Sequence, residues 1–135
     1  MIPAIVSAQA TDFWAPFEAI TRRDVAWAGG KAANLGEMMR AGIAVPPGFV
    51  ITTAAYRAHM AKHDLDSLVD EQLGHIGSGD SGTLERASAR VRDEILAGSL
   101  SAEIEAEVVE AYRQLGGGPV AVRSSATAED LPEAS

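Results

Sequence analysis

The sequence predicts an α/β fold in which several amphipathic helices cover a small sheet. Two short apolar runs, 49–52 and 120–123, have the β-branched composition of buried strands. Apolar residues at helical spacing fill two longer stretches, 84–95 and 104–115. Because each of these helices has a single apolar face, each must pack on another layer, and we expect that layer to be the sheet.

Composition limits the class of protein. The chain has 135 residues, 47% of them hydrophobic and 22% charged, which is typical of one soluble globular domain. Its net charge of −8 opposes binding to nucleic acid. The chain has no Cys, no basic signal-peptide region and no run of the roughly 20 apolar residues that span a bilayer. We therefore expect a cytoplasmic protein without nucleic-acid or membrane partners.

The first predicted element is aromatic. Residues 12–20 contain Phe13, Trp14 and Phe17, and this pattern suits either a short strand or an edge packed on the domain. A helix is then predicted from Gly30, and Gly42 suits the left-handed position beyond its end. Spacing along this helix predicts an apolar face made of Leu35, Met38 and Met39.

In the middle of the chain, a Pro-Pro-Gly turn over 45–48 leads into the strand 49–52. Either Thr52 or Thr53 is suited to cap a helix over 54–63. A weaker helical stretch follows over 65–73. The Gly- and Ser-rich residues 77–82 hold no Lys and follow no strand, so they predict a surface loop rather than a phosphate loop.

The two amphipathic helices follow this loop, and Ser101 is suited to cap the second. A glycine-rich turn over 116–119 leads into the strand 120–123, which we expect to pair with 49–52. Residues 124–135 are small and polar and include a proline, so they predict a loop.

Two places in this layout are suited to chemistry. Gly29, Gly30 and Lys31 open a helix, where unpaired amides, the helix dipole and a lysine favour an anion. The alternative is a glycine turn with a solvated lysine. Arg123 ends an apolar strand, and its planar fork suits phosphate oxygens. The alternative there is a surface arginine followed by Ser124 and Ser125 in a capped turn.

Other candidates are weaker. His59 and His63 stand at i and i+4 on a predicted helix, but they lack a third metal ligand and are interpreted as surface residues. His75 lies in a turn without an identifiable nucleophile nearby. An acidic trio suits either Mg²⁺ or a solvated loop, and it consists of Glu129, Asp130 and Glu133.

Three segments together resemble the start of phosphoenolpyruvate synthase. They are GGKAANLGEM (29–38), VPPGF (45–49) and VRSSATAEDLPEAS (122–135). Pyruvate phosphate dikinase and rifampicin phosphotransferase share versions of this text. The resemblance implies an amino-terminal, ATP-grasp-like nucleotide-binding domain spanning 1–135, in which 124–135 form part of a phosphate-site loop that stops short.

In that family ATP phosphorylates a carrier histidine, and the phosphoryl group passes to pyruvate or another acceptor with the help of Mg²⁺. The resemblance implies that Lys31 and Arg123 contact ATP phosphates, with Gly30, Ser124 and Ser125 beside them. We expect the two cations to face one cavity sized for a triphosphate.

The resemblance also implies what this chain lacks. None of its histidines matches the carrier motif, and the Mg²⁺ ligands and the acceptor site belong to text that follows in family members. We therefore expect an enzyme fragment without turnover of its own. The alternatives are a stand-alone module that binds a nucleotide or a partner, a piece of a rifampicin phosphotransferase, or a decayed reading frame without function.

Overall fold

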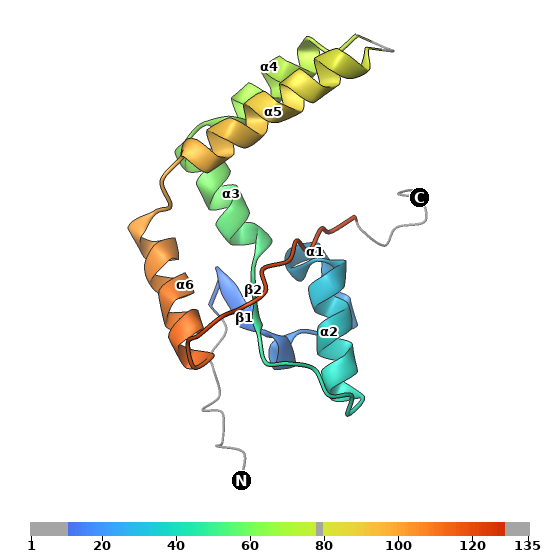
Figure 1. Cartoon of the computed structure of the whole chain (residues 1–135), viewed down its shortest axis with the longest axis vertical. Coiled ribbons are helices and arrows are strands. Elements are labelled where there is room, and N and C mark those ends of the chain that lie inside the picture. The colour runs from blue at the N-terminus through green and yellow to red at the C-terminus, as the bar shows by residue number, and fades with distance from the viewer. Residues whose placement is uncertain (1–10, 78–79, 129–135) are drawn as a thin grey trace. The chain divides into compact units, whose positions relative to one another are not determined.

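The computed structural model describes residues 11–77 and 80–128 (Figure 1). Its contacts divide the chain into two units. The first unit combines residues 1–55 with 103–135, and the second comprises 56–102. Helices and a two-stranded sheet make up the described part, which confirms the α/β class.

The first unit begins with strand β1, Trp14–Pro16, so the aromatic segment contains a strand. Short helical elements follow it: η1 (Phe17–Ala19), η2 (Arg22–Asp24) and α1 (Val25–Ala28). Helix α2 spans Gly30–Arg40, which confirms the predicted helix, and Gly42 has the expected left-handed φ of +79°. Strand β2, Phe49–Ile51, confirms the strand predicted after the Pro-Pro-Gly turn.

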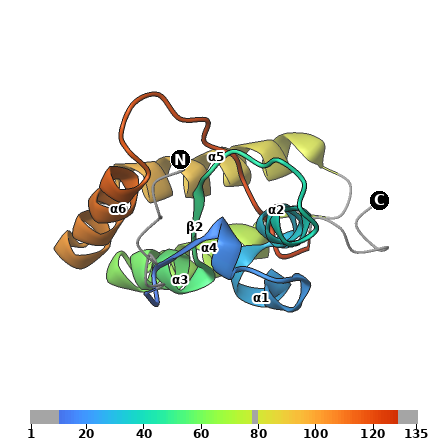
Figure 2. The same ribbon diagram turned by 90° about the horizontal axis from the view of Figure 1, so that it is seen from below.

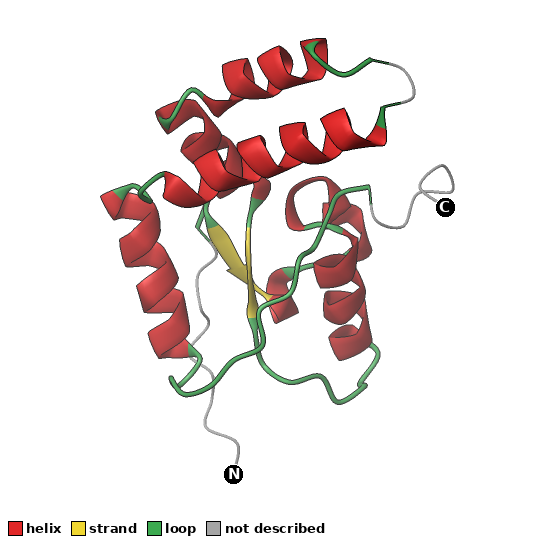
Figure 3. Ribbon diagram, turned by 45° about the horizontal axis from the view of Figure 1, so that its top comes forward, coloured by secondary structure: helices red, strands yellow, loops and turns green. Residues whose placement is uncertain are grey.

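The sheet pairs β1 with β2 in antiparallel register, with Trp14 opposite Ile51 (Figure 3). The expectation that 49–52 pair with 120–123 is therefore wrong. Strand β1 takes the place beside β2 that was expected for 120–123. The aromatic ring of Trp14 in β1 packs edge-on against Phe49 in β2, with ring centroids 5.8 Å apart. Residues 120–123 form no strand, and the side chain of Val122 is 89% exposed.

Helix α2 packs through its small residues. Its buried positions are Gly30, Ala32, Ala33 and Gly36, whereas Leu35 and Met39 are half-buried and Met38 is exposed. The predicted face of Leu35, Met38 and Met39 is thus not the one that enters the core. The reason is a close backbone approach, because a β-carbon on Gly36 would lie 2.2 Å from the carbonyl oxygen of Ile20. Larger side chains do not fit there.

The core of the first unit is small and lies between α2 and the sheet. Ile20 is fully buried at its centre, and Phe17, Val25 and Trp27 pack around it. The other members are Ala15, Ala28, Ala32, Ala33 and Val50. Alanines predominate because the backbones approach closely.

Helix α6, Ala102–Gln114, confirms the last predicted helix and buries Ile104 and Ala111. Three glycines with positive φ, Gly116 to Gly118, then turn the chain. From there the extended residues 119–126 run past the sheet toward the start of α2 (Figures 1 and 2). This course brings the last described residues to the first long helix.

The second unit is helical. It contains most of α3 (Thr53–Lys62) together with α4 (Leu65–Gly74) and α5 (Ser81–Ala97), which confirms the three helices predicted here. Helices α4 and α5 lie side by side (Figure 3). Helix α5 begins three residues earlier than its apolar pattern, because the carboxylate of Asp80 caps the amides of Gly82 and Thr83. Residues 78 and 79 of the predicted loop lie outside the described part.

Candidate phosphate-binding site at the start of helix α2

The two motifs singled out in the sequence are in contact. The ammonium group of Lys31 donates a hydrogen bond of 3.0 Å to the carbonyl oxygen of Ser124, across 93 positions of sequence. Lys31 is half-buried, whereas Ser124 and Arg123 are exposed. The structure therefore joins the lysine to the segment that carries the arginine.

Ser125 connects this segment to the helices. Its hydroxyl accepts a hydrogen bond from the amide of Ala32 at 3.0 Å and donates one to the carbonyl of Ala28 at 2.9 Å. Ala32 is the third residue of α2, where an N-cap side chain normally accepts a hydrogen bond. Gly29 occupies the N-cap position and has no side chain to do so. The hydroxyl of Ser125 takes that role from a distant part of the chain.

The neighbouring amide is satisfied in the same way. The N–H of Gly30 donates to the carbonyl oxygen of Ala126 at 3.0 Å. Residues 124–126 thus receive hydrogen bonds from the side chain of Lys31 and from two amides of the first turn of α2. At the N-terminal end of α2, which favours anions, these two amides donate to oxygens of the protein itself.

Gly29 makes this arrangement possible. Its φ of +82° lies in the left-handed region, and a β-carbon there would stand 2.1 Å from the carbonyl oxygen of Ser125. The sequence suggested that the paired glycines admit a phosphate to the backbone. The structure shows that Gly29 admits the backbone of Ser125, a role that the sequence pattern did not reveal.

The structure brings Lys31, Gly30, Ser124 and Ser125 together, and Arg123 immediately precedes Ser124 in the chain. A common cavity for a triphosphate in front of Lys31 and Arg123 stays a prediction, as do the nucleotide contacts of all five residues.

A charged group with a shifted pKa lies just before this site. Partial burial raises the pKa of the Asp24 carboxyl, but hydrogen bonds from Thr21 and Trp27, together with the charge of Arg40, outweigh that effect and hold the pKa below its ordinary value. Thr21 and Asp24 form a capping box, in which the Thr21 amide donates to Asp24 at 2.7 Å. The carboxylate therefore stabilises the chain entering α1.

Two of the three histidines, His59 and His63, make contacts within the second unit. His59 is buried, contrary to the surface position expected, and its Nε2 lies 3.0 Å from the carbonyl oxygen of Ile95. Nε2 of His63 lies 2.9 Å from the carbonyl oxygen of Ser99, and the ammonium group of Lys62 donates to the same oxygen. Among the described residues, no three His, Cys, Asp or Glu side chains cluster as metal ligands. The acidic trio at 129–133 lies outside the described part.

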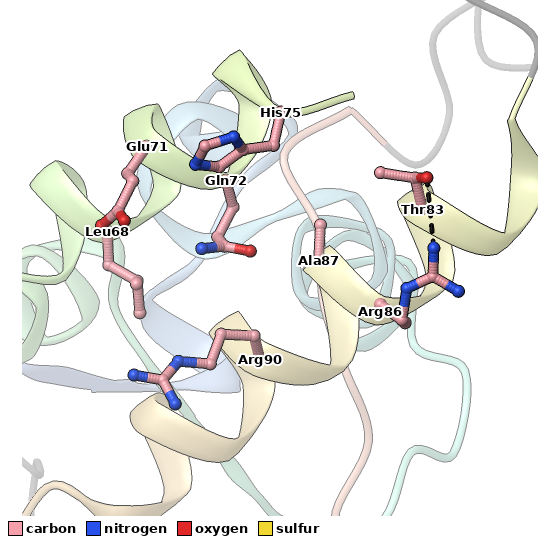
Figure 4. Close-up of a pocket in the computed structure, with 8 residues that line it drawn as sticks. All are labelled: Leu68, Glu71, Gln72, His75, Thr83, Arg86, Ala87 and Arg90. Carbon is pink, nitrogen blue, oxygen red and sulfur yellow. Dashed lines mark hydrogen bonds between the residues drawn. The ribbon is translucent and has the colours of Figure 1, made fainter. Parts of the chain in front are cut away.

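A cavity of about 510 Å³ lies between α4 and α5 and contains none of the residues expected to contact ATP (Figure 4). Two arginines on α5 line it, but Arg86 donates to Thr83 at 3.3 Å and Arg90 pairs with Glu94 at 3.3 Å. The remaining lining residues are Leu68, Glu71, Gln72, His75 and Ala87. We place the candidate site at the start of α2, where the motif residues meet.

The family pattern described as "Pyruvate phosphate dikinase, AMP/ATP-binding domain" matches residues 25–135, from the first residue of α1 onward. The chain belongs to this family. The pyruvate phosphate dikinase AMP/ATP-binding domain thus includes α1, α2, the sheet strand β2 and the segment 124–126 that contacts α2.

The chain is also similar to curated proteins that are named as phosphoenolpyruvate synthases. The probable phosphoenolpyruvate synthase of Methanothermobacter thermautotrophicus is 45% identical over 125 residues, covering 88% of this chain and 18% of the relative. The phosphoenolpyruvate synthase of Aeropyrum pernix is 45% identical over 114 residues, covering 79% and 14%. That of Deinococcus radiodurans is 37% identical over 129 residues, covering 92% and 16%. The chain therefore spans less than a fifth of the length of these relatives.

Across the described residues, no helix is both long enough and apolar enough to cross a membrane.

Proposed function

We propose that this chain is the ATP-binding portion of a phosphoenolpyruvate synthase-like phosphotransferase. In the proposed reaction of the whole enzyme, ATP phosphorylates a carrier histidine, which passes the phosphoryl group to pyruvate. The names of the relatives support pyruvate rather than an antibiotic as the acceptor. We further propose that the domain is ATP-grasp-like and acts in the cytoplasm.

The observation that carries this proposal is the contact between Lys31 and the Ser124 carbonyl. It places the ammonium group of Lys31 beside the backbone that carries Arg123, although the two residues are far apart in sequence. Two cations on adjoining segments suit the oxygens of a polyphosphate, because each charge-assisted hydrogen bond is about twice as strong as a neutral one. In this proposal Gly30, Ser124 and Ser125 lie beside the phosphates.

Phosphoryl transfer depends on positioning and on neutralising charge, and a metal ion supplies much of the second. The described residues do not form a Mg²⁺ site. In this proposal Lys31 and Arg123 bind and orient the phosphates, and the isolated chain does not turn over. Residues 124–135, whose described part reaches Ala128, are proposed to act as the phosphate-site loop.

Thermal unfolding of the whole chain at increasing Mg·ATP tests the proposal, because a ligand that binds only the folded state raises Tm, and the rise grows with the logarithm of the ligand concentration above Kd. We expect Lys31→Met and Arg123→Met each to weaken ATP binding by about tenfold or more, the value of one charged hydrogen bond. Arg57→Met, which removes an exposed cation from α3, is the matched control. A wild-type Tm that stays constant up to millimolar Mg·ATP would contradict the proposal for this chain.

A further inference from the structure

From these contacts we infer that Ser125 is a positioning residue, which holds the Arg123–Ser124 segment against the start of α2 by capping that helix from outside. The inference rests on the proposed function, because the segment held in place carries the proposed phosphate-binding cation. It changes the role expected for Ser125 from a nucleotide ligand to a support for the ligands.

The hydrogen-bonding capacity of the hydroxyl supports this assignment. A serine hydroxyl has one proton to donate, and that of Ser125 is given to the carbonyl of Ala28. A nucleotide phosphate is an acceptor, so it needs a donor, and this donor is already used. The accepting side of the same oxygen receives the amide of Ala32. Ser125 thus bridges the last residue of α1 and the first turn of α2.

Geometry explains why this bridge controls the cations. Gly29 separates α1 from α2 with a positive φ, and it has no side chain that could cap α2. Without Ser125, the amide of Ala32 would have to find water, and residues 123–126 would lose the hydroxyl that links them to both helices. Arg123 is exposed, so the backbone on either side of it must fix its position.

The first measurement needs no ligand. Amide hydrogen exchange at Ala32 in the whole chain reports the cap directly, and we expect it to be about tenfold faster in Ser125→Ala than in the wild type. Ser124→Ala, which removes the adjacent hydroxyl, should leave this rate unchanged. Ser125→Thr retains a hydroxyl and should restore the slow exchange. Circular dichroism of each variant establishes that it is folded.

The second measurement is the affinity for ATP, with Lys31→Met and Arg123→Met alongside. We expect Ser125→Ala to weaken ATP binding by about tenfold and Ser125→Thr to recover most of it, since a displaced cation loses its charged hydrogen bond. Faster exchange in Ser125→Ala together with weaker binding supports the inference.

Two outcomes would overturn it. Unchanged exchange at Ala32 in Ser125→Ala would show that the cap does not form, and weaker ATP binding in that case would make Ser125 a direct ligand. Faster exchange with unchanged affinity, while Lys31→Met and Arg123→Met do weaken binding, would show that the cap does not position the cations. If neither cation variant affects ATP binding, the proposed function fails, and exchange at Ala32 alone decides whether Ser125 holds the segment.

Discussion

Gly29 and Ser125 are in direct backbone contact, and a β-carbon on Gly29 would lie 2.1 Å from the carbonyl oxygen of Ser125 and 2.4 Å from its hydroxyl oxygen. The contact joins the junction of α1 and α2 to the segment after Arg123. It therefore connects the two motifs from which the candidate site is built.

Gly29→Ala should be strongly destabilising, because it combines a left-handed φ with this clash. Gly42→Ala is the comparison, since Gly42 has a similar φ of +79° and no atom within 4 Å of an added β-carbon. We expect Gly42→Ala to cost about 1–2 kcal/mol for the backbone alone. Gly29→Ala should cost about 2 kcal/mol more, the scale of overpacking. Urea denaturation measures both, and equal losses would show that Ser125 does not occupy this space.

Gly36→Ala should destabilise the chain although alanine is the better helix former. The added β-carbon would lie 2.2 Å from the Ile20 carbonyl oxygen, so we expect a loss of about 1–3 kcal/mol in the free energy of unfolding. Gly74→Ala, also in a helix but with open space around it, should instead gain up to about 0.5 kcal/mol. A gain at both positions in thermal or urea melts would contradict the close approach of α2.

The free energy of unfolding of the first unit should decrease at acid pH, because Asp24 becomes protonated there. Its folded-state pKa lies below the ordinary value, so its contribution is present above the unfolded pKa of about 4 and is lost as the pH falls through the lower folded value. Asp24→Asn should flatten this part of the dependence of Tm on pH between about 5 and 3. Asp12→Asn, a change at an exposed residue, serves as the comparison. Parallel curves for wild type and Asp24→Asn would refute the assignment.

His59→Ala should destabilise the second unit. The imidazole is buried and bonded to the Ile95 carbonyl, so its removal opens a cavity and leaves that oxygen without this partner. We expect a loss of about 2 kcal/mol, measured as faster amide exchange in α5. His75→Ala changes an exposed residue and should stay within about 0.5 kcal/mol. Similar effects of the two substitutions would argue against the buried position of His59.

Val122→Thr and Val50→Thr test which of the two apolar runs belongs to the sheet core. Val50 is buried in β2, so placing a hydroxyl there should cost about 1–3 kcal/mol. Val122 is 89% exposed, and its substitution should stay within about 0.5 kcal/mol. Urea denaturation that shows comparable losses would restore 120–123 as a buried strand.

The sequence alone determined helices α2 to α6 and strand β2, because these elements follow from local periodicity, turn residues and composition. It also selected Lys31, Ser124 and Ser125 separately, and its family resemblance was confirmed by the match over 25–135. The sheet pairing was predicted wrongly because β-branched composition marks a strand without naming its partner. The buried face of α2 was missed for a similar reason, since hydrophobic spacing does not register a helix that packs through glycine and alanine.

Only the tertiary structure decided that Ser125 caps α2 and that Gly29 makes room for it. A helix cap is normally local and can be read from neighbouring residues, but this one crosses 93 positions of sequence. Such a contact exists because the turn at Gly116–Gly118 sends the chain back to α2, where unpaired amides require acceptors. Residue spacing along the chain cannot predict that residues 124–126 come back to α2, so only the tertiary structure could give the geometry of the site.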